Sequence, residues 1–166
     1  ETVLGLLTGN GHEIVDSEEE ADAIVINTCC FIHDAKEESV NTILEMAEYK
    51  KNGTGKILIV TGCMAQRYKE EITEEIPEVD AVLGTTSYGD IVKALNEAEA
   101  GHVFQEFKDI NALPEDSGRR VITTGGHFGY LKIAEGCDKH CTYCIIPSLR
   151  GKFRSVPEER LLKQAE

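Results

Sequence analysis

Short apolar runs alternate with longer amphipathic segments between residues 21 and 100. The apolar runs predict strands over Ala21–Asn27, Lys56–Thr61 and Val79–Gly84. The amphipathic segments carry apolar residues every three or four positions, and they predict helices over Ala35–Lys51, Ala65–Ile76 and Ile91–Ala100. Short buried strands that alternate with helices are typical of a parallel sheet covered on both faces. The sequence therefore predicts a doubly wound, flavodoxin-like α/β fold.

The ends of these helices carry local signals. Asp34 and Ser87 can cap the first and third helices, because their side-chain oxygens can accept hydrogen bonds from free backbone N–H groups. Pro77 stops the second helix and Gly101 ends the third. Residues 1–11 have the pattern of the last turns of an amphipathic helix that a glycine closes.

A change of composition follows residue 100. Residues 101–126 are rich in glycine, threonine and acidic residues, which predicts a linker with one short strand near Val103–Phe107. The apolar run Tyr130–Ala134 then predicts the first strand of a second domain. We expect a first domain over 1–100 that lacks its first strand and the beginning of a second domain over 127–166. The chain is then a fragment of a longer protein, inactive by itself.

Charge is distributed unevenly along the chain. The 17 basic and 30 acidic side chains give a net charge of −13. Residues 1–118 hold 25 acidic and 8 basic side chains, whereas residues 119–166 hold 5 acidic and 9 basic ones. Few clustered cations argue against a general phosphate-binding surface. No apolar run approaches the roughly 20 residues of a membrane span, and no signal peptide is visible, so we expect a cytoplasmic protein.

Three of the six cysteines form the pattern C-x3-C-x2-C at Cys137, Cys141 and Cys144. A zinc site needs four ligands, and His140 could supply the fourth only from a position next to Cys141. Three thiolates in a loop that follows a strand suit a 4Fe–4S cluster with one iron left open. Zinc and buried structural cysteines remain the alternatives.

Two further cysteines, Cys29 and Cys63, directly follow predicted strands. Parallel open sheets bind ligands at the carboxyl ends of their strands, so the pair is a candidate site. A free cysteine is also a common buried residue, and we interpret Cys30 as a buried thiol. A flavin-binding domain is a third possible function, but no phosphate-binding loop supports it.

The cysteine loop resembles the radical S-adenosylmethionine signature, because Tyr143 precedes its last cysteine. Residues 130–155 resemble the methylthiotransferase family, and residues 26–32 and 60–67 resemble the N-terminal domain of that family. The resemblance implies that the second domain begins a partial TIM-type α/β barrel. It also implies a 4Fe–4S cluster on the three-cysteine loop whose open iron binds S-adenosylmethionine, with Tyr143 against that cofactor.

The same resemblance implies a second 4Fe–4S cluster at Cys29 and Cys63, with its third cysteine upstream of the chain. Sulfur delivery would use this second cluster, and an electron donor such as flavodoxin or ferredoxin would supply reducing power. Cys30 occupies a position that the family does not use as a ligand.

Two substrates are known in this family. Residues 146–151 resemble the branch that adds a methylthio group to the β-carbon of an aspartate in a small-subunit ribosomal protein. The alternative branch modifies an adenosine next to the anticodon of tRNA. An acidic first domain suits a basic ribosomal protein better than a polyanionic RNA.

Overall fold

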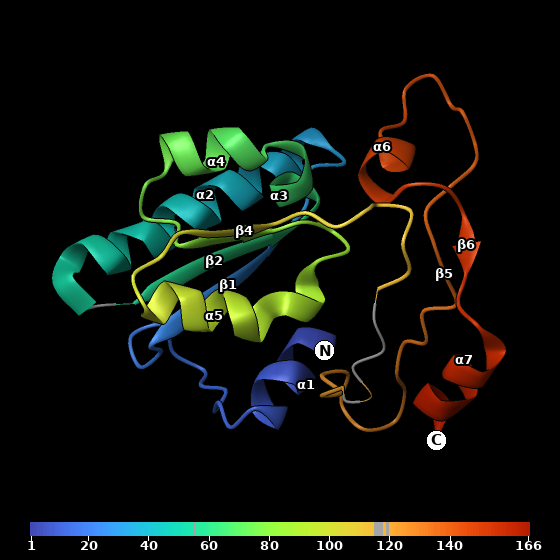
Figure 1. Ribbon diagram of the computed structural model, residues 1–166, viewed down its shortest axis with the longest axis horizontal. Helices are drawn as coiled ribbons and strands as arrows, with labels where there is room; N and C mark the ends of the chain where they lie inside the picture. Colours follow the sequence, from blue (N-terminus) through green and yellow to red (C-terminus); the bar gives the residue numbers. More distant parts are fainter. Residues whose placement is uncertain (55, 115–117, 119) are drawn as a thin grey trace.

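A computed structural model describes residues 1–54, 56–114, 118 and 120–166. Its centre is a parallel four-stranded sheet (Figure 1). The strands lie side by side in chain order: β1 (Ala23–Thr28), β2 (Ile57–Gly62), β3 (Ala81–Leu83) and β4 (Phe104–Glu106). The register places Thr28 beside Gly62, so β1 and β2 end together at one edge of the sheet.

Helices cover both faces of the sheet. One face carries α2 (His33–Tyr49), α3 (Cys63–Arg67) and α4 (Lys69–Glu75), and the other carries α1 (Thr2–Gly9) and α5 (Ile91–Glu99) (Figure 1). Successive residues of β2 face opposite cores, as the alternation of a strand requires: Leu58 and Val60 pack with the first group, and Ile59 packs with the second. The predicted doubly wound α/β fold is confirmed.

Neither predicted N-cap is formed. Asp34 lies inside the first turn of α2, whose N-cap is Ile32 without a side-chain hydrogen bond. Ser87 precedes the 3-10 turn η2 (Tyr88–Asp90) rather than α5, and its hydroxyl accepts the backbone N–H of Lys108 at 2.9 Å. The Ser87 hydroxyl oxygen, which the sequence predicted to cap a helix, is used in a tertiary hydrogen bond instead.

The helix predicted over 65–76 is two helices, and the first starts at Cys63. The chain turns at Tyr68, whose backbone (φ −119°, ψ 34°) lies outside the helical region. The turn allows Met64 and Ile72, from the two short helices, to bury their side chains in the same core. At its C-terminal end α2 continues as a π-helical segment η1 (Lys50–Thr54).

The sheet extends beyond residue 100. The short strand expected near residues 103–107 is present as β4, and it pairs in parallel with β3 at the edge of the sheet. By contrast, the strand predicted over Tyr130–Ala134 is mostly absent. Only β5 (Ala134–Glu135) pairs, antiparallel with β6 (Arg154–Ser155). Among the described residues no strand lies beside 130–133, and Tyr130 is 70% exposed.

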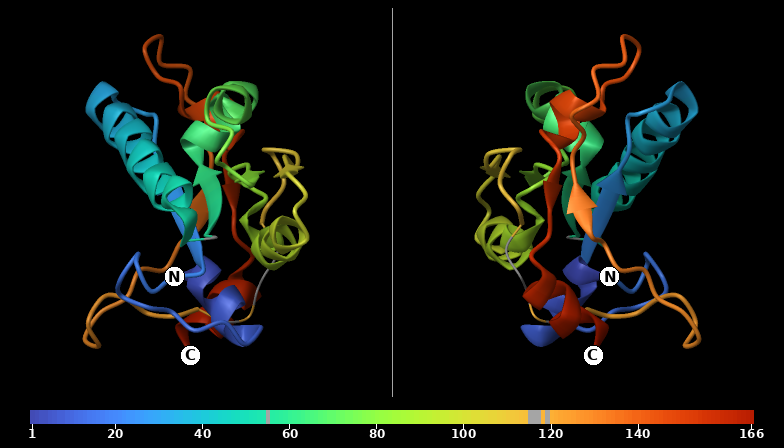
Figure 2. Two further views of the ribbon diagram at one scale, coloured as in Figure 1. Left: turned by 90° about the vertical axis from the view of Figure 1, so that its left-hand side faces the viewer. Right: turned by 90° about the vertical axis from the view of Figure 1, so that its right-hand side faces the viewer.

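Two more helices follow the cysteine loop, α6 (Ile146–Arg150) and α7 (Glu158–Ala165). The described part of the chain contains no α/β barrel, since β5 and β6 form a separate two-stranded sheet. The views from the two sides place α6 near α3, with both chain termini at the opposite end of the molecule (Figure 2). Among the described helices, none has the length and apolar content needed to cross a membrane.

Candidate functional site

Cys29 and Cys63 lie at the same edge of the sheet, as their positions after two strands predicted. Thr28 and Gly62 are paired in the register of β1 and β2, and each cysteine directly follows the last residue of one of these strands. Cys29 is exposed, whereas Cys63 is half-buried at the first position of α3. Both thiols also lie near enough to Cys30 to influence its ionisation. The structure therefore places three free cysteines at one edge of the sheet.

Gly62 allows this close approach of the two strand ends. Its φ of +101° lies in the region that favours glycine, and a Cβ atom there would lie 2.8 Å from Asn27 Oδ1 and still closer to the carbonyl oxygen of Thr28. The hydroxyl of Thr28 donates to the Thr61 carbonyl at 2.6 Å. A side chain at position 62 would separate β1 from the start of α3, and with it Cys29 from Cys63.

Ser39, in α2, holds the backbone of Cys29. Its hydroxyl accepts the N–H of Cys29 at 3.0 Å, and it lies within donating distance of the carbonyls of Cys29 (2.9 Å) and Ala35 (2.8 Å). Sequence reasoning missed this residue. A serine ten positions after a cysteine carries no local signal, because the contact exists only once α2 packs against β1.

Cys30 is the buried thiol that the sequence predicted. It is 4% exposed and belongs to the core beneath α2 and α3. Burial raises the pKa of the Cys30 thiol above its ordinary value of 9.0, the nearby Cys63 adds to this rise, and Arg67 opposes it through charge and a hydrogen bond. Cys30 therefore stays a neutral thiol at neutral pH.

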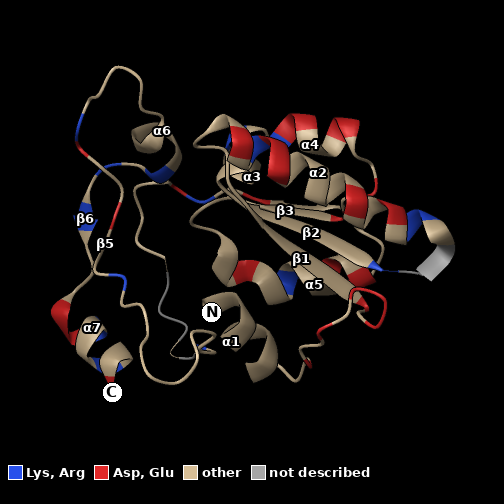
Figure 3. Ribbon diagram, turned by 180° about the vertical axis from the view of Figure 1, so that it is seen from behind, with Lys and Arg blue, Asp and Glu red and all other residues tan. Residues whose placement is uncertain are grey.

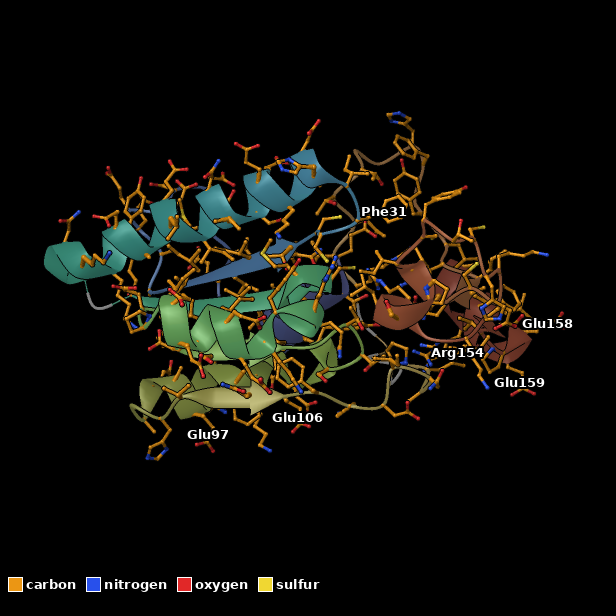
Figure 4. All side chains as sticks on the ribbon, turned by 90° about the horizontal axis from the view of Figure 1, so that it is seen from above. Phe31, Glu97, Glu106, Arg154, Glu158 and Glu159 are labelled. Carbon is orange, nitrogen blue, oxygen red and sulfur yellow. The ribbon has the colours of Figure 1, made fainter. Side chains whose placement is uncertain are left out.

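A small group of cations lies beside these cysteines in an otherwise acidic domain. Arg67 ends α3, and its guanidinium carbon lies 5.0 Å from the centre of the Tyr68 ring. Lys36 lies 4.6 Å from the same ring centre and donates to the Tyr68 hydroxyl at 3.1 Å. Figure 4 shows Phe31, which follows the cysteine pair and is 48% exposed, at the start of α2, on the side that faces the C-terminal part. The role of Arg67 beside Cys30 was not predicted.

The three-cysteine loop extends into solvent. Cys141 is exposed, Cys137 and Cys144 are half-buried, and none of the three forms a disulfide. Tyr143 is 89% exposed, and His140 is exposed as well. Over the described residues, no three Cys, His, Asp or Glu side chains are arranged to hold a metal ion. The structure thus places the three thiols in one loop without gathering them around a point.

The donor set nevertheless fits an iron–sulfur cluster. The loop offers three thiols within eight residues and one histidine, so most of its possible metal ligands are sulfur atoms. All three cysteines lie in irregular backbone that can bring them together. One hydrogen bond, from the N–H of Cys144 to the carbonyl of Cys141 at 3.1 Å, already forms a turn between two of them. Thiolates are the usual cluster ligands.

The base of this loop is narrow and glycine-lined. The N–H of Cys137 donates to the carbonyl of Gly151 at 3.1 Å, joining the two ends of the loop. Gly136 has a φ of +74°, and a Cβ atom there would lie 2.6 Å from the Gly151 oxygen and closer still to that of Lys152. The two ends can approach this closely because Gly136 has no side chain, whereas the missing side chain of Gly151 makes room for the backbone of Ile110.

Glu135 adds an ion pair at the same base. The residue is 8% exposed, and its carboxylate lies 3.7 Å from Nη1 of Arg150, with Lys132 as a second partner. Burial of a carboxylate is costly unless cations compensate it, so this pairing favours one arrangement of the loop ends. Glu135 precedes the first loop cysteine by two residues, and sequence analysis did not identify it.

Comparison with known proteins gives several close relatives. The chain is 63% identical over 166 residues to the ribosomal protein uS12 methylthiotransferase RimO of Lachnoclostridium phytofermentans. It is 49% identical to the protein of the same name from Clostridioides difficile, and 46% identical to that from Trichlorobacter lovleyi. All of this chain is covered in each comparison, but the chain spans only 37–38% of the length of these relatives.

These relatives confirm the resemblance to methylthiotransferases that three separate cysteine motifs indicated. Residues 1–84 also match the family described as "Uncharacterized protein family UPF0004". The matched part contains β1, β2 and β3 with Cys29 and Cys63, the same residues that build the sheet-edge site. Since the match extends over just more than half of the 166 residues, the chain belongs to the uncharacterized protein family UPF0004.

Proposed function

We propose that this chain is part of a radical S-adenosylmethionine methylthiotransferase that adds a methylthio group to the β-carbon of an aspartate of ribosomal protein uS12. The observation that carries the proposal is the C-x3-C-x2-C loop, whose three cysteines are free. It lies in a chain that aligns over all of its residues with relatives that bear this enzyme name. Residues 101–126 connect the two parts and also supply the edge strand β4 of the first, and the protein works in the cytoplasm.

In this proposal, Cys137, Cys141 and Cys144 hold a 4Fe–4S cluster. When bound, the cluster and S-adenosylmethionine supply reductive cleavage of the sulfonium and hydrogen abstraction from an unactivated C–H bond. The chain holds the cysteine loop at its base through Gly136, Gly151 and the buried Glu135. Tyr143, exposed on the loop, packs against the bound S-adenosylmethionine and excludes water from it.

Cys29 and Cys63 hold a second 4Fe–4S cluster together with a cysteine outside this chain. The supporting geometry is the paired end of β1 and β2, where Gly62 and Ser39 fix the positions of the two backbones. Arg67 supplies positive charge beside sulfurs that carry negative charge when they bind iron. This site delivers sulfur, and a flavodoxin or ferredoxin delivers electrons.

The acidic face of the first part suits a basic substrate protein. Exposed glutamates gather on two neighbouring helices of one sheet face (Figure 3). They are Glu37, Glu38, Glu45 and Glu48 of α2 and Glu70, Glu71, Glu74 and Glu75 of α4. A field of one sign attracts a partner of opposite charge and repels RNA. This charge adds to the name of the relatives and to the likeness of residues 146–151 as support for the ribosomal protein over tRNA as the substrate.

Anaerobic reconstitution of the full-length protein tests the metal sites. We expect bound iron and sulfide, with about half of the iron lost in Cys141→Ala, because one of two clusters is removed. Cys30→Ala is the matched control and should keep its iron, since this buried thiol is not a proposed ligand. Stoichiometric zinc without iron, or equal iron in both variants, would contradict the assignment.

Mass spectrometry of the products tests the substrate. The reconstituted enzyme should add one methylthio group to an aspartate of uS12 when S-adenosylmethionine and a reductant are present. Modification of tRNA but not of uS12 would overturn the choice of substrate while leaving the radical chemistry in place. Uptake of flavin without iron would overturn both.

A further inference from the structure

The cysteine loop is attached to the first part of the chain through α6. Leu149, at the end of α6, is 4% exposed and belongs to the same core as Met64 and Ala65 of α3. Ile145, which follows the last loop cysteine, packs against that core as well. Helix α6 therefore completes a core that is otherwise built by the first part of the chain.

A buried hydrogen bond accompanies this packing. The hydroxyl of Thr85, itself 4% exposed, donates to the backbone carbonyl of Leu149 at 2.9 Å. The N–H of Thr85 donates to Oε1 of Gln66 at 3.1 Å, so the loop after β3 is also held to α3. Gly84 leaves the space for this glutamine, because a Cβ atom at position 84 would overlap its side-chain oxygen.

Other contacts hold the chain after α6 near the same place. The N–H of Lys152 donates to Oδ1 of Asn111 at 3.0 Å, and Nη2 of Arg154 donates to the carbonyl of Ala112 at 3.0 Å. Figure 4 places Arg154 in the C-terminal part, beside the segment that follows β4. These bonds are exposed, whereas the bond from Thr85 is shielded from water and is therefore the strongest constraint.

The two helices joined by Thr85 each start at a candidate cysteine site. Helix α3 begins at Cys63, and α6 begins two residues after Cys144. Short helices are rigid over their few residues, so the contact between α3 and α6 sets how far the cysteine loop lies from the sheet edge. A sulfur atom delivered from one site to a radical formed at the other requires such a fixed separation.

We infer that Thr85 is a positioning residue, which fixes the three-cysteine loop relative to the Cys29–Cys63 site by holding the Leu149 carbonyl. The expected effect on transfer between the two sites rests on the proposed function. The packing of α6 against the core does not depend on bound metal. Thr85 acts through α6 and contacts neither cofactor nor substrate. Loss of its hydroxyl should uncouple cofactor cleavage from transfer.

Hydrogen exchange and product ratios in the full-length protein test this inference. Thr85→Val keeps the shape of the side chain but removes the donor to the buried Leu149 carbonyl. This loss should speed amide exchange across residues 145–151 by roughly tenfold. Thr85→Ser keeps the hydroxyl and should restore slow exchange. In the reconstituted enzyme, Thr85→Val should still cleave S-adenosylmethionine but should form more 5′-deoxyadenosine for each methylthio group transferred.

Thr86→Val is the matched control. Thr86 is 7% exposed, and its hydroxyl donates to the carbonyl of Lys108 at 3.2 Å, in the segment after β4 rather than in α6. This variant should leave both the exchange of residues 145–151 and the product ratio unchanged. Equal exchange in wild type and Thr85→Val, or an equal effect of Thr86→Val, would overturn the inference. A wild-type enzyme without methylthio transfer would instead refute the proposed function, and the exchange result would stand.

Discussion

Gly62 shows how one missing side chain builds the sheet-edge site. The residue stands between the end of β2 and the start of α3, and its φ of +101° is one that side-chain-bearing residues rarely adopt. Cys29 and Cys63 can lie side by side because the backbone of β1 occupies the volume of the absent Cβ. At this scale the sequence identified the cysteines, but not the serine and the arginine beside them.

Replacement of this glycine should destabilise the fold. Gly62→Ala introduces both backbone strain and overlap with Thr28, and we expect a loss of about 2–4 kcal/mol in the free energy of unfolding. Gly89→Ala is the control, since Gly89 has no positive φ and nothing lies within 4 Å of its added Cβ atom. Denaturant titration of both variants measures the difference, and equal midpoints would contradict the close approach.

Burial should also separate the reactivity of the cysteines. In the metal-free protein, Cys29 and Cys141 are exposed, whereas Cys30 is 4% exposed and has a raised pKa. Alkylation proceeds through the thiolate, so Cys30 should react last under native conditions and at the common rate after unfolding. Mass spectrometry of peptides from a timed reaction with iodoacetamide follows each site. Labelling of Cys30 as fast as Cys29 would show that the site is open.

Helices and strands are held in place by contacts that the hydrophobic pattern of their own residues does not predict. Lys56 opens the run that forms β2, yet it is only 3% exposed. Its ammonium group donates to the carbonyls of Glu19 (2.9 Å) and Ala21 (2.8 Å), and also to that of Glu18. Lys56 therefore holds the acidic loop before β1 against the start of β2. The break at Tyr68 is a similar case, because packing on the sheet overrides the helical pattern of residues 65–76.

Removal of this ammonium group should loosen the loop. Lys56→Met leaves backbone carbonyls without a donor, and we expect a loss of about 2–4 kcal/mol in stability with faster proteolysis within residues 12–22. Lys93→Met is the control on the exposed side of α5, where the contact with the Phe104 ring at 5.0 Å is lost. The control should change stability by less than about 1 kcal/mol. Similar losses in both variants would argue against a special role for Lys56.

Over the whole molecule, charge and chemistry are divided between two parts. The acidic helices α2 and α4 lie on one face of the sheet, and the mildly basic C-terminal part carries the three-cysteine loop. Helix α6 joins the two through a shared core. Under the proposed function, this acidic surface would speed the encounter with a basic substrate protein at low ionic strength.

Neutralisation of the α4 glutamates tests this role. Replacement of Glu70, Glu71, Glu74 and Glu75 by glutamine should lower the association rate with uS12 by about tenfold at low salt, and the difference should disappear at high salt. Glutamine at Glu13, Glu18, Glu19 and Glu20, in the loop before β1, removes as many exposed charges from another part of the surface. Stopped-flow rates that fall equally in both variants would point to net charge alone.

The sequence alone was sufficient for the α/β fold, for the alternation of strands and helices over residues 21–100 apart from the break at Tyr68, and for the edge where Cys29 and Cys63 meet. These follow from local periodicity and from the geometry of parallel strands, which short stretches of chain encode. The C-x3-C-x2-C loop stays a prediction as a cluster site, because its thiols are not gathered around a metal ion within the described residues.

Contacts between distant residues decided the rest. Ser39 at Cys29, Thr85 at Leu149 and Ser87 at Lys108 each use a hydroxyl whose partner lies 10 to 64 positions away. Such a group has several possible partners of similar energy in the extended chain, so its own neighbours in sequence do not select one. Burial selects it, since a polar atom removed from water must be paired inside the fold.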